Sequence, residues 1–474
     1  MKKYLIIPIE IQKRELSAAC NLIVEALKKN WTVIIGQKQQ IFPFIINLPK
    51  SIWFLKSIVP GENSLLKKIK KSGHLITSLD IEGLIPSNIK ESLRQRYSVD
   101  NINLSDAIFF WGKIHYNLFL KTFPKTKQNI LFITGSPVND VWIKNKSITN
   151  HNKKNILIIP SFGYANTYTK NLNLFYAYDN VGAKSLSNHN DLLFSIKDNI
   201  ENDFQSQKLG YKSFINLITI LCKHFTDHII TIRPHPSENI AMWNFLLKDN
   251  TNLRIDSKED SQKQILKSKA VIHFNSTMSV QSSLLNKKTI LYFDIDKKYK
   301  KILSPLTLKL SKFVTKPSEV IKEINNNERD DKLNFLKKLL VNVEFNWSSN
   351  SSKSIVSIFD SLLSNFKNNY LYNEKIFFNG LYSKYLFGRY YFLNYYLVPF
   401  LSYFSFIPFL RRFSHGNIYR KYKIDRDKLL KNKWPGISIY ELSKVIQEAA
   451  LGRKFNSKWK IKRHFAGFFF VSKK

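Results

Sequence analysis

Short apolar runs alternate with longer amphipathic stretches along most of this chain. The runs are rich in β-branched residues and stop on polar or turn-forming residues, which is typical of buried strands. The stretches between them, such as Glu15–Lys29 and Gly210–His224, have the spacing of helices. This alternation predicts a doubly wound α/β fold. The predicted strands are Tyr4–Ile9, Thr32–Ile35, His74–Thr77, Ala107–Phe110, Asn129–Ile133, Asn155–Pro160, Ile229–Ile232, Leu253–Ile255, Ala270–Phe274 and Thr289–Tyr292.

The alternation falls into two halves. A polar stretch rich in Asn and Lys, around Lys144–Lys154, separates them, and the pattern then restarts. We therefore predict a Rossmann-like domain over residues 1–150 and a second one over residues 151–345. Residues 346–474 do not continue the pattern, and we expect them to form a helical, basic and aromatic-rich extension.

The composition gives the chain a large positive charge, which bears on the partners it could bind. The chain has 74 Lys and Arg against 35 Asp and Glu, a formal net charge of +39, and 44% hydrophobic residues, enough for a folded protein. Nucleic acid, anionic lipid and acidic polysaccharide are all compatible with this charge, and so is an AT-rich coding sequence. The two cysteines, Cys20 and Cys222, are far apart in apolar helical patterns, which predicts reduced thiols and a cytoplasmic protein. The N-terminal apolar run is too short for a signal peptide.

Two predicted strands in the second half end on side chains suited to a phosphate. Ile229–Ile232 is followed by Arg-Pro-His-Pro, and Ala270–Phe274 by Asn275, Ser276 and Thr277. Parallel strands deliver such residues to one edge of a sheet, where hydroxyl, imidazole and helix-opening N–H groups can bind a phosphate or diphosphate. A packed or capping histidine is the commoner role for a lone His-Pro dipeptide. We interpret His235, Ser276 and Thr277 together as a donor-phosphate pocket.

Four other residues lie in or near these loops, and for Arg233, Gly163 and Asn166 the sequence leaves two interpretations open. Arg233 either adds charge to the phosphate or forms a salt bridge in the domain core, while His273, inside an apolar run, is expected to be a core residue. Gly163 and Asn166 follow the first strand of the second half and either line the pocket or form a plain turn.

In the first half, a strand ends on two carboxylates. Asp80 and Glu82 follow the run at His74–Thr77, and Gly83 permits a sharp turn after them. One of the two carboxylates could take a proton from an acceptor hydroxyl as a general base. The alternative is an N-cap or a solvated loop acid. No GxGxxG, Walker A or DxD-type motif follows a predicted strand, so the sequence points to no metal ion or cofactor.

The motifs together resemble a known family. In chain order they are Ile7-Pro-Ile-Glu-Ile-Gln-Lys-Arg-Glu-Leu16, Ser78-Leu-Asp-Ile-Glu-Gly-Leu84, Phe132-Ile-Thr-Gly-Ser-Pro137, Arg233-Pro-His-Pro236 and Phe274-Asn-Ser-Thr277. Over about residues 1–345, the chain resembles bacterial surface carbohydrate biosynthesis proteins, and more widely the GT-B glycosyltransferases that use CMP-activated sialic acid or Kdo. The resemblance implies two facing Rossmann-like domains, with the acceptor on the first and the nucleotide sugar on the second.

By the same resemblance, Asp80 or Glu82 is the acid/base, His235 binds the donor phosphate and assists its departure, and Ser276 and Thr277 donate hydroxyls to it. The pattern departs from the family at two places. Gln281 stands where a glutamate would hold the donor ribose, and Val138 stands where an arginine would follow Pro137.

A stretch in the last hundred residues suggests a membrane surface. Residues 390–410 form an uncharged run of about twenty residues, long enough on paper to span a bilayer. Its tyrosines and prolines, with Arg389, Arg411 and Arg412 at its ends, are more typical of an interfacial segment on anionic lipid. The alternative is that these aromatic residues pack as extra core. We predict a peripheral protein on the inner face of the cytoplasmic membrane.

Three functions follow, in order of preference. The first is a metal-independent glycosyltransferase that moves a nonulosonic acid or Kdo-type sugar from a CMP donor to a glycan or lipid-linked glycan acceptor. The second is a CDP-polyol transferase of the glycerophosphate type that acts on a lipid-linked polymer. The third is a basic nucleic-acid-binding protein, which the dispersed charge and the lack of a recognisable binding motif disfavour.

Overall fold

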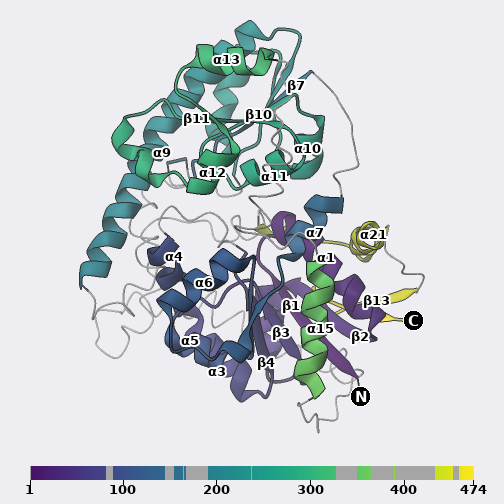
Figure 1. Cartoon of the computed structure of the whole chain (residues 1–474). Helices are drawn as coiled ribbons and strands as arrows, with labels where there is room; N and C mark the ends of the chain where they lie inside the picture. Colours follow the sequence, from purple (N-terminus) through teal and green to yellow (C-terminus); the bar gives the residue numbers. More distant parts are fainter. Residues whose placement is uncertain are drawn as a thin grey trace. The chain divides into compact units, whose positions relative to one another are not determined.

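The computed structural model describes residues 2–81, 89–144, 154–163, 165–166, 190–235, 238–326, 350–364, 389, 433–451 and 458–474. The chain divides into two compact units (Figure 1). Unit 1 comprises Met1–Ile81, Arg94–Val141 and Val343–Lys474, and unit 2 comprises Glu82–Leu93 and Trp142–Asn342. Both units are built around a sheet with parallel strands, so the predicted pair of Rossmann-like α/β units is confirmed.

The first stretch of the chain supplies most of unit 1. Its elements are β1 (Lys3–Ile9), α1 (Gln12–Lys28), β2 (Trp31–Gln37), α2 (Lys38–Ile41), η1 (Phe42–Phe44), β3 (Ile52–Leu55), η2 (Pro60–Glu62), α3 (Asn63–Lys71), β4 (Leu75–Leu79), α4 (Ile89–Arg96), α5 (Val99–Leu104), β5 (Ala107–Phe110), α6 (Lys113–Thr122), η3 (Gln128–Ile130), β6 (Leu131–Ile133) and α7 (Pro137–Lys144). The strands are apolar and almost wholly buried, as parallel strands covered on both faces must be.

Within the described residues, the unit 1 sheet has the order β13-β14-β2-β1-β3-β4-β5-β6. The strands from β2 to β6 are parallel, and β1 pairs with β2 on one side and with β3 on the other. Because the chain leaves β1 in one direction for β2 and later returns to its other side, the boundary between β1 and β3 is a topological switch point. Ligands of open α/β sheets bind at such points, outside the carboxyl ends of the strands.

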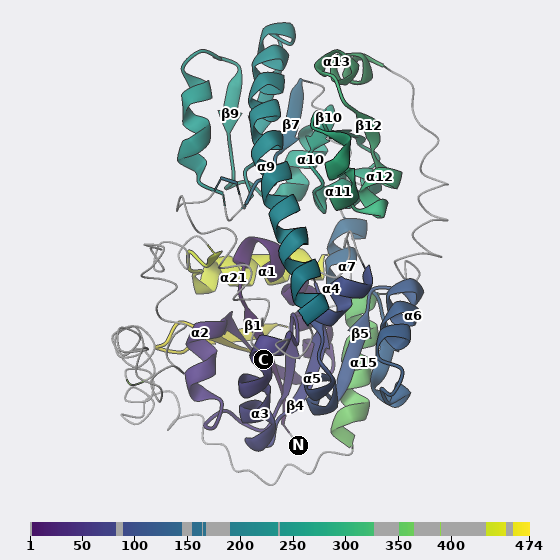
Figure 2. The ribbon, with the colours of Figure 1, turned by 90° about the vertical axis from the view of Figure 1, so that its left-hand side faces the viewer.

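The described C-terminal elements belong to unit 1 and include a β-hairpin, whereas the sequence predicts a separate helical extension. Its described elements are α15 (Ser351–Ser364), α21 (Ile439–Ala450), β13 (Trp459–Arg463) and β14 (Phe469–Lys473). Helices α15 and α21 pack against α1 (Figure 2), and β14 pairs antiparallel with β2. At Gly36, an added Cβ would come within 2.4 Å of the Phe468 Cβ, so this glycine is what lets the hairpin approach β2. The segment therefore completes unit 1.

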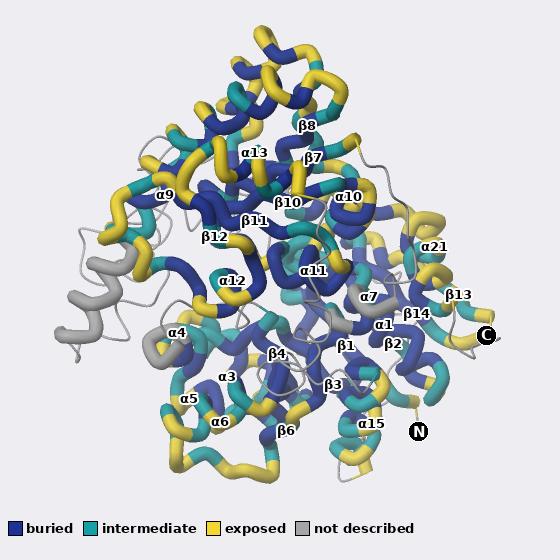
Figure 3. The backbone as a smooth tube through the Cα atoms, turned by 45° about the horizontal axis from the view of Figure 1, so that its top comes forward, coloured by how far each residue is buried: buried dark blue, intermediate teal, exposed yellow. Residues whose placement is uncertain are grey.

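Unit 2 is formed by the middle of the chain. Its elements are β7 (Asn155–Ile159), α9 (Asn190–His224), β8 (Ile229–Ile232), η5 (Ile240–Leu247), β9 (Leu253–Ile255), α10 (Ser261–Lys267), β10 (Ala270–His273), α11 (Met278–Leu284), β11 (Lys288–Tyr292), η6 (Lys297–Ile302), α12 (Pro305–Leu310), β12 (Lys312–Val314) and α13 (Pro317–Asn325). Figure 3 shows the central strands β7, β10 and β11 in the dark blue of buried residues.

The described strands of unit 2 have the order β12-β11-β10-β7-β8-β9, all parallel. Counted from β7, this is the 3-2-1-4-5-6 order of dinucleotide-binding folds, and its switch point lies between β7 and β10. On one face an aromatic core packs around Gly210 of α9, where an added Cβ would come within 2.8 Å of Phe274 and 2.9 Å of Phe162. This packing fixes the starts of the loops that follow β7 and β10.

The structure describes only part of the region that the sequence analysis relates to a membrane. Residues 390–410 lie outside the described part of the chain. Among the helices that are described, none is both long and apolar enough to cross a bilayer.

Candidate functional site

Three neighbouring strands of unit 1 each end on a charged residue. Glu10 follows β1, Lys56 follows β3 and Asp80 follows β4. Because these strands are parallel, the three residues lie along the carboxyl edge of one sheet. Sequence analysis predicts only Asp80 among them.

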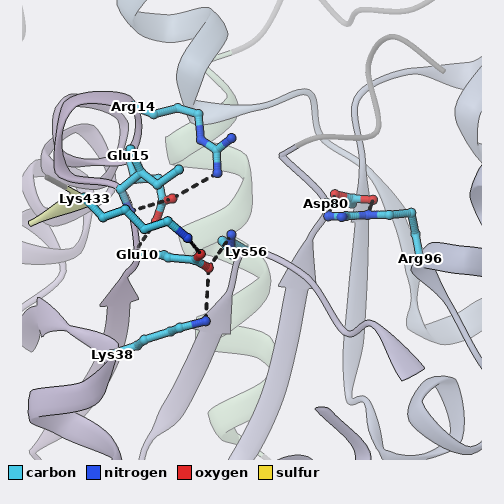
Figure 4. Close-up of polar contacts among 9 residues, drawn as sticks. Glu10, Arg14, Glu15, Lys38, Lys56, Asp80, Arg96 and Lys433 are labelled. Atoms are coloured by element: carbon cyan, nitrogen blue, oxygen red, sulfur yellow. Dashed lines mark hydrogen bonds and ion pairs between the residues drawn. The ribbon is translucent and has the colours of Figure 1, made fainter. Parts of the chain in front are cut away.

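Glu10 is the centre of a cluster of lysines (Figure 4). Its carboxylate accepts from the Nζ atoms of Lys56 at 2.6 Å, Lys433 at 2.8 Å and Lys38 at 3.0 Å. Burial alone would raise the pKa of Glu10, but the three ammonium charges outweigh burial and hold the pKa well below its usual range. For Lys38, burial lowers the pKa, but the charge of Glu10 reverses the effect and raises it. Glu10 and Lys38 are therefore both ionised at neutral pH.

The neighbouring acid, Glu15, has a structural task. Its two oxygens accept from the backbone N–H groups of Glu10 and Ile11 at 2.9 and 3.1 Å, which closes the first turn of α1. A pocket beside it is lined by Pro8, Arg14, Glu15, Lys56 and Ser136, among others. The capping bonds thus fix the backbone of Glu10 at the edge of this pocket.

Asp80 is held in an ion pair. Arg96 donates from Nε to Oδ2 at 2.7 Å and from Nη2 to Oδ1 at 2.5 Å, and Trp111 donates to the Asp80 carbonyl oxygen at 2.7 Å. Asp80 is 2% exposed. With both carboxylate oxygens engaged by one guanidinium, Asp80 is poorly placed to accept a proton from a substrate. Its sequence partner Glu82 lies outside the described residues.

Two other polar side chains are buried near Asp80. Burial raises the pKa of Tyr97 well above its usual value and lowers the pKa of His115 to about 4. Within the described structure, neither the Tyr97 hydroxyl nor either ring nitrogen of His115 has a hydrogen-bond partner. Both side chains are therefore neutral at physiological pH and leave Arg96 as the counter-ion of Asp80.

In unit 2, left-handed residues lie on both sides of the switch point. Ser161, after β7, has φ 62°, and Asn275, after β10, has φ 49°. Non-glycine residues rarely take this conformation and keep it only where neighbours enforce it, which occurs often at functional sites. At Asn275 the enforcing contacts are visible: its Oδ1 accepts from the Ser304 N–H at 3.0 Å, and its Nδ2 donates to the Ile302 carbonyl at 3.0 Å.

The predicted phosphate-binding residues after β10 share one turn. The Ser276 N–H donates to His273 Nδ1 at 3.2 Å, and the other ring nitrogen of His273 lies 2.8 Å from the Ser311 hydroxyl. Burial lowers the pKa of His273 to about 3, so it is a neutral core residue. The Ser276 hydroxyl accepts from the Met278 N–H at 3.3 Å, whereas Thr277 is exposed. Gln281 is buried in α11.

Glu238, which no sequence motif singles out, joins the other two loops. Its Oε1 accepts from the backbone N–H groups of Phe162 at 3.0 Å and His235 at 2.9 Å. Its Oε2 accepts from Trp243 Nε1 at 3.0 Å and Asn166 Nδ2 at 3.3 Å. Glu238 is 1% exposed, and burial raises its pKa to about 7 despite these four donors. A glutamate three residues after His235, just before an apolar turn, was the available signal.

Glu238 also clarifies the remaining predicted residues. Asn166 is buried against it, so it shapes the loop after β7 and does not line an open pocket, while Gly163 lies in the same loop. The His235 side chain is exposed beside this network. Arg233 points elsewhere: its Nη1 donates at 2.7 Å to both the Glu259 carbonyl and Gln264 Oε1. These contacts favour the structural interpretation of Arg233.

No protein-family model and no curated protein matches the sequence. Among solved structures, the chain is similar to the UDP-GlcNAc 2-epimerase of Methanocaldococcus jannaschii, with 14% identity, a TM-score of 0.43, and 76% of this chain and 100% of that chain covered. The chain is also similar to the UDP-GlcNAc 2-epimerase of Neisseria meningitidis, with 14% identity, a TM-score of 0.45, and 77% of this chain and 100% of that chain covered. For the wall teichoic acid polymerase TagF, the identity is 13% and the TM-score 0.47, and 76% of this chain and 89% of that chain are covered. None of these similarities assigns a role to a residue of this chain.

Proposed function

We propose that this chain is a transferase of surface glycan biosynthesis that binds a nucleotide-activated donor in unit 2. The observation that supports it most is the switch point between β7 and β10, flanked by the left-handed Ser161 and Asn275. Nucleotides bind at this position in sheets of this strand order. The exposed side chains of His235 and Thr277 follow β8 and β10, the strands on either side of β7. We assign both to the donor phosphate.

The donor we propose first is a CMP-linked acidic sugar, in accordance with the sequence motifs. The acceptor oxygen would bond to the anomeric carbon while the bond from that carbon to the phosphate oxygen breaks, so that CMP leaves with the bonding electrons. The acceptor proton would pass to a carboxylate. Because Asp80 is bound by Arg96, we assign this task to Glu82 and give Asp80 the task of positioning the start of its loop.

A second donor class, a CDP-linked polyol, is favoured by Arg233. An acidic sugar has a carboxylate that needs a cation, and Arg233 is engaged with Glu259 and Gln264. A polyol donor has no such requirement. For either donor we propose a glycan or lipid-linked acceptor and a site of action on the inner face of the cytoplasmic membrane, since the charge of +39 favours anionic surfaces.

The test is calorimetric titration of CMP, CDP, UDP and GDP into the wild type and into His235→Ala. His228→Ala is the matched control, because His228 precedes β8 and His235 follows it, so the two lie at opposite ends of one strand. We expect a cytidine nucleotide to bind selectively, with binding lost only in His235→Ala. Turnover of CMP-sialic acid, CMP-Kdo and CDP-glycerol then separates the two donor classes. Equal binding by both variants, or preference for a uridine or guanosine nucleotide, would refute the donor assignment.

A further inference from the structure

The lysine cluster around Glu10 lies at the other switch point of the molecule. Glu10 and Lys56 directly follow β1 and β3, the two strands that flank the switch point of the unit 1 sheet. Strand order alone therefore marks this place as a ligand site. Glu10 belongs to the first sequence motif, but Lys38, Lys56 and Lys433 lie outside all of the motifs.

The charges of the cluster do not balance. Three ammonium groups, from Lys38, Lys56 and Lys433, face one carboxylate, that of Glu10. Glu62 lines a pocket together with Glu10, Lys38 and Lys56 and adds a second carboxylate, while Glu15, which also acts on Lys38, is paired with Arg14. The side chains of the three lysines are only 19–28% exposed, so solvent screens their mutual repulsion less than at an open surface. Among the described residues, the three lysines exceed Glu10 and Glu62 by one positive charge.

Four separate segments converge to build this arrangement. Glu10 follows β1, Lys38 opens α2, Lys56 follows β3, and Lys433 comes from the C-terminal part of the chain (Figure 4). The pocket at the cluster has an apolar wall that includes Phe42, Leu55 and Leu65. A cluster made only to stabilise the fold would be more stable with matched charges, because like charges held close together in a partly buried site repel one another.

We propose that Lys38, Lys56 and Lys433 bind a phosphate group of the acceptor, and that the Glu10 carboxylate holds the three ammonium groups together until the phosphate arrives. That the phosphate belongs to the acceptor rests on the proposed transferase function; the phosphate site itself does not. A phosphate supplies negative charge to match the excess of the cluster, and its several oxygens can accept from three ammonium groups at once. A diphosphate of a lipid carrier and a phosphodiester of a polymer share this chemistry.

The experiment measures thermal stabilisation of the full-length protein by inorganic phosphate, at constant ionic strength maintained with chloride. Lys56→Met and Lys433→Met should each weaken phosphate binding by about tenfold, since each removes one charge-assisted hydrogen bond. Lys70→Met is the matched control: Lys70 pairs with Asp106 at 2.6 Å, just before β5 at the amino edge of the same sheet. It should leave phosphate binding unchanged.

Glu10→Gln distinguishes a phosphate site from a structural salt-bridge cluster. If phosphate replaces the carboxylate, this variant should bind phosphate more tightly than the wild type, and phosphate should restore its lost stability. If the cluster is only structural, Glu10→Gln loses stability that phosphate does not restore, and the proposal fails. Should Lys56→Met not fold, Lys433→Met and Glu10→Gln still decide, because Lys56 is intact in both variants.

Two further ligands distinguish the possible sources of the phosphate. Inorganic pyrophosphate represents the diphosphate of a lipid carrier, and glycerophosphoglycerol represents the phosphodiester of a polymer. Stabilisation that disappears in His235→Ala but persists in Lys56→Met would locate the phosphate in unit 2 and overturn the proposal. Nucleotide titrations report on unit 2 independently. Loss of phosphate binding in the lysine variants with intact nucleotide binding supports this site whatever the donor proves to be, whereas failure of the nucleotide titrations alone refutes only the donor assignment.

Discussion

Glu238 tests which of two opposing effects controls a buried carboxyl group. Burial disfavours its charged form, while four N–H donors favour it. The structure indicates that burial prevails and raises the pKa of Glu238 from 4.5 to about 7. A shift of this size is worth about 3 kcal/mol. Because the native pKa is raised, this stability is fully present below the pKa of the unfolded chain and is lost as the pH rises through about 7.

Glu238→Gln removes this dependence on pH. At about pH 5 the native carboxyl is mostly neutral, so the amide is a near-isostere and the free energies of unfolding should differ by about 1 kcal/mol or less. At about pH 8 the wild type contains a buried charge and the variant does not, so the variant should gain up to about 3 kcal/mol relative to the wild type. Asn166 can rotate its amide to accept from the new NH₂ group, since its Oδ1 has no partner among the described residues.

The assay is urea-induced unfolding at a series of pH values, followed by tryptophan fluorescence because Trp243 contacts Glu238. Glu319→Gln is the control: backbone N–H groups at the start of α13 lower the pKa of this exposed glutamate from 4.5, so its difference from the wild type should stay flat between about pH 5 and pH 8 and change only below about pH 4.5. A difference for Glu238→Gln that stays constant, or that grows against the variant above about pH 7, would mean that the four donors outweigh burial. The reasoning would then be wrong.

Three further predictions concern residues that shape the two edges. Asp80→Asn should lower the free energy of unfolding by about 3 kcal/mol by leaving Arg96 without its buried counter-ion, and adding Arg96→Met should cost less than the sum of the single changes in a double-mutant cycle. Gly210→Ala should cost about 1 kcal/mol in urea unfolding, because overpacking against the rings of Phe162 and Phe274 exceeds the gain in helix propensity, and calorimetry should also show weaker nucleotide binding. His273→Phe should cost about 2 kcal/mol for two lost hydrogen bonds. Since the native pKa of His273 is about 3, the wild type loses stability as the pH falls below about 6.5. Thermal melting at a series of pH values should show a smaller loss of stability for His273→Phe. An equal loss would assign the acid sensitivity to other groups.

The sequence predicts the strands well where a long apolar run makes them unmistakable. Residues 155–159, 229–232 and 270–273 are strands as expected, and they present the expected loops. The strand at Ile52–Leu55 was missed, and Lys56 with it, although it is as long as the predicted strand at Ala107–Phe110; a short apolar run cannot be told from a buried helical segment by its period alone. The pairing of β14 with β2 depends on contacts between residues at opposite ends of the chain, which no local pattern encodes.

The same limit applies to the chemistry of the site. Asp80 was visible because it follows a predicted strand, but its bond to Arg96 depends on where α4 ends. The Glu10 cluster needs Lys433, and no spacing rule connects these two positions. Glu238 was within reach, since its distance from His235 is short, yet its burial is a tertiary property. A local pattern thus identifies the loops, and only packing shows which side chains in them are free to meet a ligand.

The hairpin of β13 and β14 has a consequence for how the protein is made. On the ribosome, unit 2 has all of its strands once residue 314 has emerged, but β2 still lacks its neighbour β14, and Glu10 lacks Lys433. An edge strand without its partner invites pairing with other chains. A nascent chain, or one cut before residue 433, would therefore contain the proposed donor unit with an incomplete acceptor unit. Because Lys433 follows the strands of unit 2 in the chain, the lysine cluster around Glu10 is complete only after those strands have been made.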